Sequence, residues 1–223
     1  MVYHFEFGAV LQSWPLLLEG TIKTIELSMS AMIIGLLIAM FCSWGKSSGP
    51  RWLHYAIDAY IEVIRNTPFL IQLFFFFFAL PALGVQMSAS MAALVAMFVN
   101  LGASATEILR AGVEAIPKGQ VEAGLALNLK RYQVFLFVVL RPALKTIFPA
   151  LSSQFILLML TSSIVSTISA DDLASVAANI QSQTFRSFEI YIVVTAIYFV
   201  LSLAFMGIFK LAWKRFLYFP EGR

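Results

Sequence analysis

The polar side chains that could bind a small polar solute lie inside long apolar stretches of this chain. Asn100, Ser104 and Glu107 follow one another at a spacing that places them on one face of a helix. A polar group at membrane depth is costly unless it has a partner or faces water, and such groups mark paths for solutes and ions. We therefore expect this face to line a path. A second candidate set holds hydroxyls and carboxylates: Thr161, Ser162, Ser163, Ser166, Asp171 and Asp172.

These polar residues also have plainer interpretations, which the sequence leaves open. Hydroxyls in membrane helices commonly bond the backbone carbonyls of their own helix. The amide of Asn100 needs several partners, which favours the path for that residue. The adjacent carboxylates of Asp171 and Asp172 could attract a cationic solute, or they could be a solvated pair at a helix end.

The elements that must position these side chains are membrane-spanning helices. Hydrophobic residues make up 60% of the 223 residues and charged residues 12%, proportions typical of a membrane protein. A helix needs about 20 apolar residues to cross the hydrocarbon core. The uncharged runs predict one all-α domain, residues 1–223, with five crossings at about residues 24–45, 59–81, 87–106, 146–169 and 190–210.

The lysine and arginine residues predict how the five crossings are oriented. Cytoplasmic flanks of membrane helices keep positive charge, whereas short translocated loops largely lack it. With the N-terminus outside and the C-terminus inside, all but Lys23 and Arg186 of the 15 basic residues fall on the cytoplasmic side. The basic residues then serve as topology signals and lipid contacts, so we expect no nucleic-acid binding.

The longest charged stretch, residues 107–145, is predicted to lie on the cytoplasmic side. A helix continues from the third crossing until Pro117, and a second, short helix then begins. Asn128 is expected to end that helix, because asparagine tolerates the left-handed conformation found at helix ends. The sequence therefore predicts a helix, a turn and a further helix at the membrane surface.

This short helix has the composition of a docking surface. Glu122 is followed by two small residues, Ala123 and Gly124, and Gly119 lies near its start. Small residues beside a bend permit close approach by a partner. An amphipathic helix lying in the membrane interface explains the apolar face of the segment equally well.

Several kinds of chemistry lack the residues they need. The single cysteine, Cys42, and the distant His4 and His54 argue against a metal site. The crossings supply hydroxyls without a neighbouring base, which argues against an intramembrane enzyme. Gly45-Lys46-Ser47 lacks the remaining glycine and strand of a phosphate-binding loop, so we expect no nucleotide hydrolysis and no cofactor in this chain.

Four motifs in order resemble one family, the permeases of ATP-binding cassette importers for polar amino acids such as histidine, glutamine, glutamate, arginine and lysine. Glu122-Ala-Gly with Asn128 six residues later is similar to the EAA motif of these permeases. Three further stretches resemble the family's sequence: Tyr60-Ile-Glu-Val-Ile-Arg-Asn-Thr-Pro68, Gln72-Leu-Phe-Phe, and Glu107-Ile-Leu-Arg-Ala-Gly-Val-Glu-Ala-Ile-Pro-Lys-Gly-Gln120. The resemblance covers nearly the whole chain. It departs from the family at Gly124, Asn128 and Asn66, where the family has alanine, glycine and glycine, and at Arg141-Pro142, where the proline is displaced by one residue.

The resemblance implies a permease that works by rigid coupling in a bacterial or archaeal inner membrane. The segment around Glu122 would dock on a pair of ATPase subunits, which bind ATP and Mg²⁺. A second permease, either a copy or a paralogue, and an extracytoplasmic substrate-binding protein would complete the importer. Structural or gating roles fall to Glu62, Arg65, Asn66, Pro68, Glu107 and Arg110, with Glu62 and Arg65 expected to form an ion pair. The alternative is a channel-like or structural membrane subunit without ATP coupling.

Overall fold

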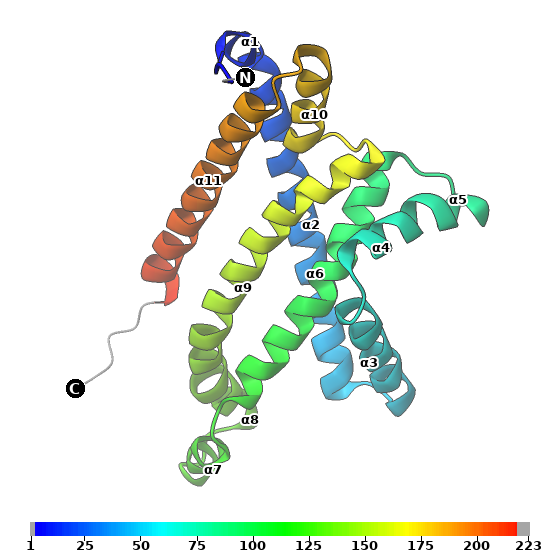
Figure 1. Ribbon diagram of the computed structural model, residues 1–223. Helices are drawn as coiled ribbons and strands as arrows, with labels where there is room; N and C mark the ends of the chain where they lie inside the picture. Colours follow the sequence, from blue (N-terminus) through cyan, green and yellow to red (C-terminus); the bar gives the residue numbers. More distant parts are fainter. Residues whose placement is uncertain (1–2, 218–223) are drawn as a thin grey trace.

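The protein is an elongated bundle of helices (Figure 1). The computed structural model describes residues 3–217. Within this range, four helices are long and apolar enough to cross a membrane: Trp14–Lys46, Ala89–Glu114, Pro142–Ile168 and Ser187–Arg215. A bent pair, Arg51–Arg65 and Phe69–Ala82, meets the same criteria when it is taken as one span. With that pair included, the fold agrees with the five crossings expected from the sequence.

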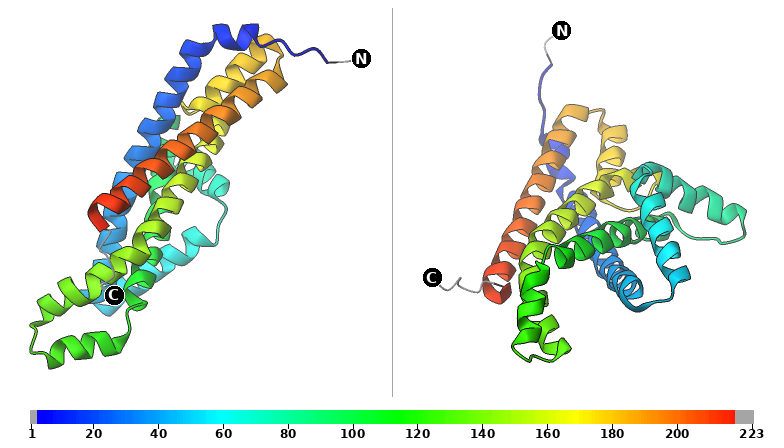
Figure 2. Two further views of the ribbon diagram at one scale, coloured as in Figure 1. Left: turned by 90° about the vertical axis from the view of Figure 1, so that its left-hand side faces the viewer. Right: turned by 90° about the horizontal axis from the view of Figure 1, so that it is seen from below.

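The helices alternate between two ends of the bundle, which Figures 1 and 2 show from three directions. We name these the α10 end, where the described chain begins, and the α7 end, where α6 turns back into α9. The elements in chain order are α1 (Gly8–Gln12), α2 (Trp14–Ser48), α3 (Arg51–Arg65), α4 (Phe69–Phe74), the π-helical turn η1 (Phe75–Ala79), α5 (Leu80–Ala82), α6 (Ala89–Glu114), α7 (Lys118–Ala126), α8 (Arg131–Gln133), the π-helical η2 (Val134–Leu140), α9 (Arg141–Thr161), the 3-10 helical η3 (Ser162–Ile168), α10 (Leu173–Thr184), α11 (Ser187–Ala212) and the π-helical η4 (Trp213–Leu217).

The second crossing is not the single helix expected over residues 59–81. It begins earlier, at Arg51, and it bends by 109° between Arg65 and Phe69. Pro68 is the physical cause, because proline cannot donate to the preceding turn and keeps Thr67 out of the helical conformation. Asn66 ends α3 with φ −98° and ψ 7°, outside the left-handed region, although the resembled family has glycine at this position.

The centre of the bundle is the contact between α2 and α6, where small residues let the two backbones approach. A Cβ on Gly35 would lie 2.9 Å from Leu101, and a Cβ on Gly102 would lie 2.8 Å from Ile38. Small residues at helix contacts are the usual solution in membranes, where packing takes over from the hydrophobic effect. These glycines therefore fix how deeply α2 and α6 interlock.

The phenylalanine run of residues 74–78 divides between packing and exposure, as its spacing around a helix predicts. Phe75 and Phe78 are 53% and 61% exposed, whereas Phe74, Phe76 and Phe77 pack against the central core. The exposed rings and the largely exposed apolar side chains of α11 suit contact with lipid. The largest share of the buried central core comes from α6, with further residues from α2, α4, α9 and η3.

Candidate functional site

The short helix of the predicted docking surface is α7, which projects from the α7 end of the bundle (Figures 1 and 2). Gly119, Glu122 and Ala123 are exposed residues of this helix, and Glu122 forms no ion pair with any residue in the described range. Leu125 and Leu127 beside them are 46% and 78% exposed. An unpaired acid next to exposed leucines is a surface that another protein could cover.

Asn128 ends α7 as predicted. Its φ is +59°, in the left-handed region. The amide of Leu129 donates to the Gly124 carbonyl at 3.2 Å, and the Asn128 amide donates to the Leu125 carbonyl at 2.9 Å. This pair of bonds is a Schellman motif, which satisfies the last carbonyls of a helix. The turn that presents α7 is thus set by local chemistry.

Gly124 does not have the role expected of it. It is buried against η2 of the same chain, where a Cβ would lie 3.2 Å from Val134 and 3.4 Å from Val138. Its small size therefore lets α7 pack on η2, and the surface left for a partner is the opposite one, with Glu122 and Ala123. The sequence showed that a close approach occurs but not which element makes it.

The two helices that enter and leave this segment are held together just above α7. A Cβ on Gly112 of α6 would lie 2.1 Å from Cγ1 of Ile147 on α9. Ile147 is 4% exposed. Between α6, α7 and η2 lies a pocket of about 360 Å³, lined by Val113, Ile116, Lys118, Val121, Glu122 and Val139. A force on α7 would reach α6 and α9 together through these contacts.

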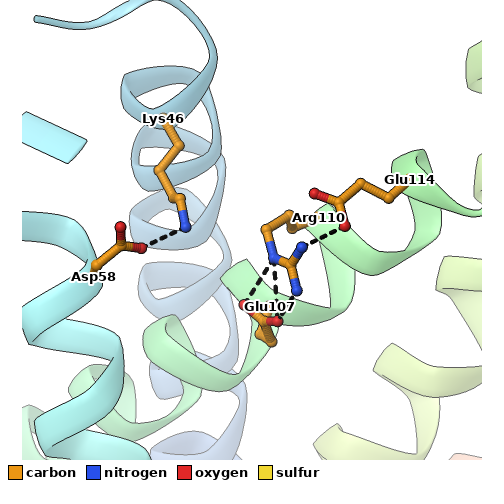
Figure 3. A network of polar contacts seen from close by, with 5 residues as sticks. All are labelled: Lys46, Asp58, Glu107, Arg110 and Glu114. Carbon is orange, nitrogen blue, oxygen red and sulfur yellow. Dashed lines mark hydrogen bonds and ion pairs between the residues drawn. The ribbon is translucent and has the colours of Figure 1, made fainter. Parts of the chain in front are cut away.

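Two separate ion-pair groups lie toward the α7 end (Figure 3). Arg110 lies between Glu107 and Glu114 on α6, and its Nε donates to both Glu107 oxygens at 3.1 Å. Lys46 of α2 reaches Asp58 of α3 at 2.5 Å. The first group stiffens the last turns of α6 and the second ties α2 to α3. Lys46 thus has a structural partner on α3.

The ion pair expected between Glu62 and Arg65 is absent from the described part of the chain. Both side chains are exposed on α3. An exposed pair one turn apart gains little over solvation by water, which accounts for the difference. At the opposite end, Lys23 and Glu26 of α2 form an ion pair at 3.1 Å.

Asn100, Ser104 and Glu107 lie on one face of α6, but two of them already have partners. The Asn100 amide donates to Gln72 of α4 at 3.1 Å, and Glu107 holds Arg110. The hydroxyls at the end of α9 and in η3 follow the plainer interpretation. They bond carbonyls three or four residues earlier, at 2.7 Å for Thr161, Ser162 and Ser166 and 2.8 Å for Ser163.

Asp171 and Asp172 are not a solvated pair, and they differ from each other. Asp172 is fully buried, where it caps α10 by accepting from the Ser175 amide at 2.8 Å. Burial raises the pKa of Asp172. Asp171 is exposed and accepts from Ser90 at 3.3 Å. It lines an open groove of about 340 Å³ together with Lys23, Glu26, Leu27, Ser30, Ser88, Ser90, Met91 and Leu94.

Gln72 and Glu189 are buried polar groups that were not among the candidate residues. Gln72, 6% exposed, lies at the bend of the second crossing. Glu189 is fully buried and accepts from the Tyr3 hydroxyl at 2.5 Å and from the Glu6 amide at 3.0 Å, which holds the N-terminal segment against α11. Both stand in or beside apolar runs, so the cost of burying a polar group was the signal that could have found them.

The fold and this segment define a class of protein: a multi-pass helical membrane protein that presents a short surface helix at one end of its bundle. Residues 31–218 match the family described as the binding-protein-dependent transport system inner membrane component. The match spans most of the chain, and the chain belongs to this family.

Relatives and solved structures agree with this membership. The chain is 32% identical to the glutamine transport system permease protein GlnP of Escherichia coli K12, over 92% of this chain and 95% of the relative. It is 35% identical to the arginine transport system permease protein ArtQ of Bacillus subtilis 168, over 90% and 92%. It is also similar to a chain in the crystal structure of an amino acid ABC transporter with histidines. That similarity has a TM-score of 0.89 and 37% identity, over 96% of this chain and all of the other.

Proposed function

We propose that this chain is the membrane-spanning permease subunit of an ATP-driven importer, and that it carries a polar amino acid across the inner membrane. The observation that carries the proposal is α7, a Schellman-terminated helix with exposed Glu122 at the base of two crossings, in a chain of this transport family. A channel-like or structural subunit would not need such a helix. In this proposal the α7 end faces the cytoplasm.

The proposed importer contains further chains. Two ATPase subunits, with ATP and Mg²⁺, would cover α7, and their closure would move α6 and α9 as a unit. A second permease, identical or paralogous, would complete the path, and an extracytoplasmic binding protein would deliver the substrate at the α10 end. Membership of a binding-protein-dependent family supports this arrangement.

The groove at the α10 end supports an amino acid as the substrate. It offers the ammonium of Lys23 and the carboxylates of Glu26 and Asp171. A zwitterionic amino acid carries one group of each charge, so it could pair with both kinds of side chain. The relatives are named for glutamine and arginine, which supports a polar side chain in the substrate.

The test is a charge reversal on α7. Glu122→Lys is expected to lower both ATPase co-purification and ATP-dependent amino-acid uptake by roughly tenfold or more. The introduced lysine would face the positive charge on the ATPase that Glu122 is proposed to contact, and two like charges across an interface cost several kcal/mol. Gln120→Lys is the matched control. It adds a lysine to the same helix two positions away, where side chains do not share a face. Normal ATPase association and uptake in Glu122→Lys would contradict the docking role.

A further inference from the structure

Gln72 lies at the bend of the second crossing, and both the nitrogen and the oxygen of its side-chain amide form hydrogen bonds. Its Nε2 donates to the carbonyls of Ile64 at 2.7 Å and Thr67 at 3.0 Å, and it lies 2.9 Å from the Thr67 hydroxyl. Its Oε1 accepts from Asn100 of α6 at 3.1 Å. One side chain on α4 thus satisfies the open end of α3 and also reaches a third helix.

The α3 side of the bend is fixed to the same turn of α6. The Tyr60 hydroxyl donates to the Val99 carbonyl at 2.6 Å. A Cβ on Gly102 would lie 2.7 Å from that hydroxyl, so only glycine leaves room for the tyrosine. The two halves of the bent crossing are therefore attached to neighbouring residues, Val99 and Asn100.

These contacts distinguish a fixed bend from a hinge. A hinge needs backbone groups that can exchange partners at little cost. Here the Ile64 and Thr67 carbonyls beside the break at Pro68 have the Gln72 side chain as their donor, and Gln72 is itself buried. Opening the bend would take this donor away from both carbonyls.

We infer that Gln72 is a positioning residue that locks the bent crossing to α6, so that both move as one body. If the proposed function holds, motion of α7 reaches the bent crossing through α6, which continues from Asn100 to Glu114, close to the start of α7. The tie itself is a property of this chain and does not depend on a partner.

The rigidity of the bend can be measured in the isolated chain, reconstituted in lipid nanodiscs, from the distance between two spin labels determined by double electron–electron resonance. Spin labels at Val63 of α3 and Phe78 of η1, which are 60% and 61% exposed, span the bend. The single native cysteine is first removed by Cys42→Ala. We expect one narrow distance distribution with Gln72 present and a broad or double distribution in Gln72→Leu.

A milder variant separates the two functions of the residue. Asn100→Ala removes the tie to α6 and leaves the bonds at the bend, so the Val63–Phe78 distribution should stay narrow. A second label pair, at Phe78 and the exposed Val113 of α6, should broaden. Ser152→Ala, which deletes a bond to the Phe148 carbonyl within α9, is the matched control and should change neither distribution.

Transport assays then test the consequence. In the complete complex, Gln72→Leu and Asn100→Ala should retain ATP hydrolysis and lose uptake by roughly tenfold, the scale of one buried hydrogen bond. A merely structural defect would lower both activities together. Unchanged distributions in a folded Gln72→Leu, or a wild-type Val63–Phe78 distance that shifts when ATP is added to the complex, would overturn the inference. Failure to recover any ATPase would instead refute the proposed function, and the isolated-chain distances would still decide the role of Gln72.

Discussion

Gly112→Ala tests whether the two helices on either side of α7 act as one unit. The added Cβ would lie 2.1 Å from Cγ1 and 2.7 Å from Cδ1 of Ile147, and 3.5 Å from the Ala143 carbonyl. Carbon atoms pack best at about 3.5–4.0 Å. The new methyl therefore cannot be placed without moving α9 or the isoleucine.

The structure allows little relief of this clash. Ile147 is 4% exposed, and a β-branched side chain in a helix has essentially one χ1 rotamer. Overpacking of this kind costs about 1–3 kcal/mol. A loss of about 2 kcal/mol in the free energy of unfolding would lower the ratio of folded to unfolded protein by roughly 30-fold.

The assay is reversible unfolding in mixed detergent micelles, followed by the fluorescence of the four tryptophans. Gly207→Ala on α11 is the matched control, because its Cβ would meet nothing within 4 Å. That control should be neutral or stabilising by about 0.5–1 kcal/mol. Ile147→Ala provides the space, so Gly112→Ala should cost little in that background even though Ile147→Ala alone costs about 2–5 kcal/mol.

Gly112→Ala and Ile147→Ala should therefore be non-additive: the double variant should lose about 1–3 kcal/mol less unfolding free energy than the sum of the two single variants. Strict additivity, or equal behaviour of Gly112→Ala and Gly207→Ala, would refute the reasoning. It would mean that α6 and α9 separate at this point.

The remaining predictions concern single groups at the two ends of the bundle. Asn128→Gly should preserve α7 and ATPase association, whereas Asn128→Val should cost about 1–2 kcal/mol or more, because a β-branched residue resists the left-handed conformation; equal association in both variants would contradict this. Because burial raises the pKa of Asp172, its contribution to the stability of the folded chain is fully present below about pH 4 and is lost as the pH rises through the raised value. Asp172→Asn keeps an oxygen for the Ser175 amide and should remove this pH dependence in unfolding titrations; an unchanged profile would argue against it. Glu189→Gln should loosen the N-terminal segment, so that chymotrypsin cleaves at Phe5 and Phe7 several-fold faster; wild-type cleavage rates would show that the segment is held by other contacts.

Much of the fold followed from one-dimensional features of the chain. The uncharged runs predicted the number of crossings, because the thickness of a bilayer sets a length that can be read from the sequence. Asn128 and Pro117 bracketed α7, since caps and breaks are decided by a residue and its immediate neighbours.

The site was harder to predict, because its residues are defined by what lies opposite them. Gly124 was expected to admit a partner, but η2 occupies that space. Asp171 and Asp172 are adjacent in sequence, yet one caps a buried helix end and the other faces a groove. The sequence shows the chemical type of such residues, but it does not show which residues of other helices lie opposite them.

The sequence by itself determined that this is a helical membrane protein with a surface helix ending at Asn128, because hydropathy, proline and capping act within a few residues. Only the tertiary structure decided that Gln72 joins the bend of the second crossing to Asn100 on α6 and that Gly112 receives Ile147. These contacts join residues separated by tens of positions. Their geometry depends on how closely whole helices pack, which no local pattern records.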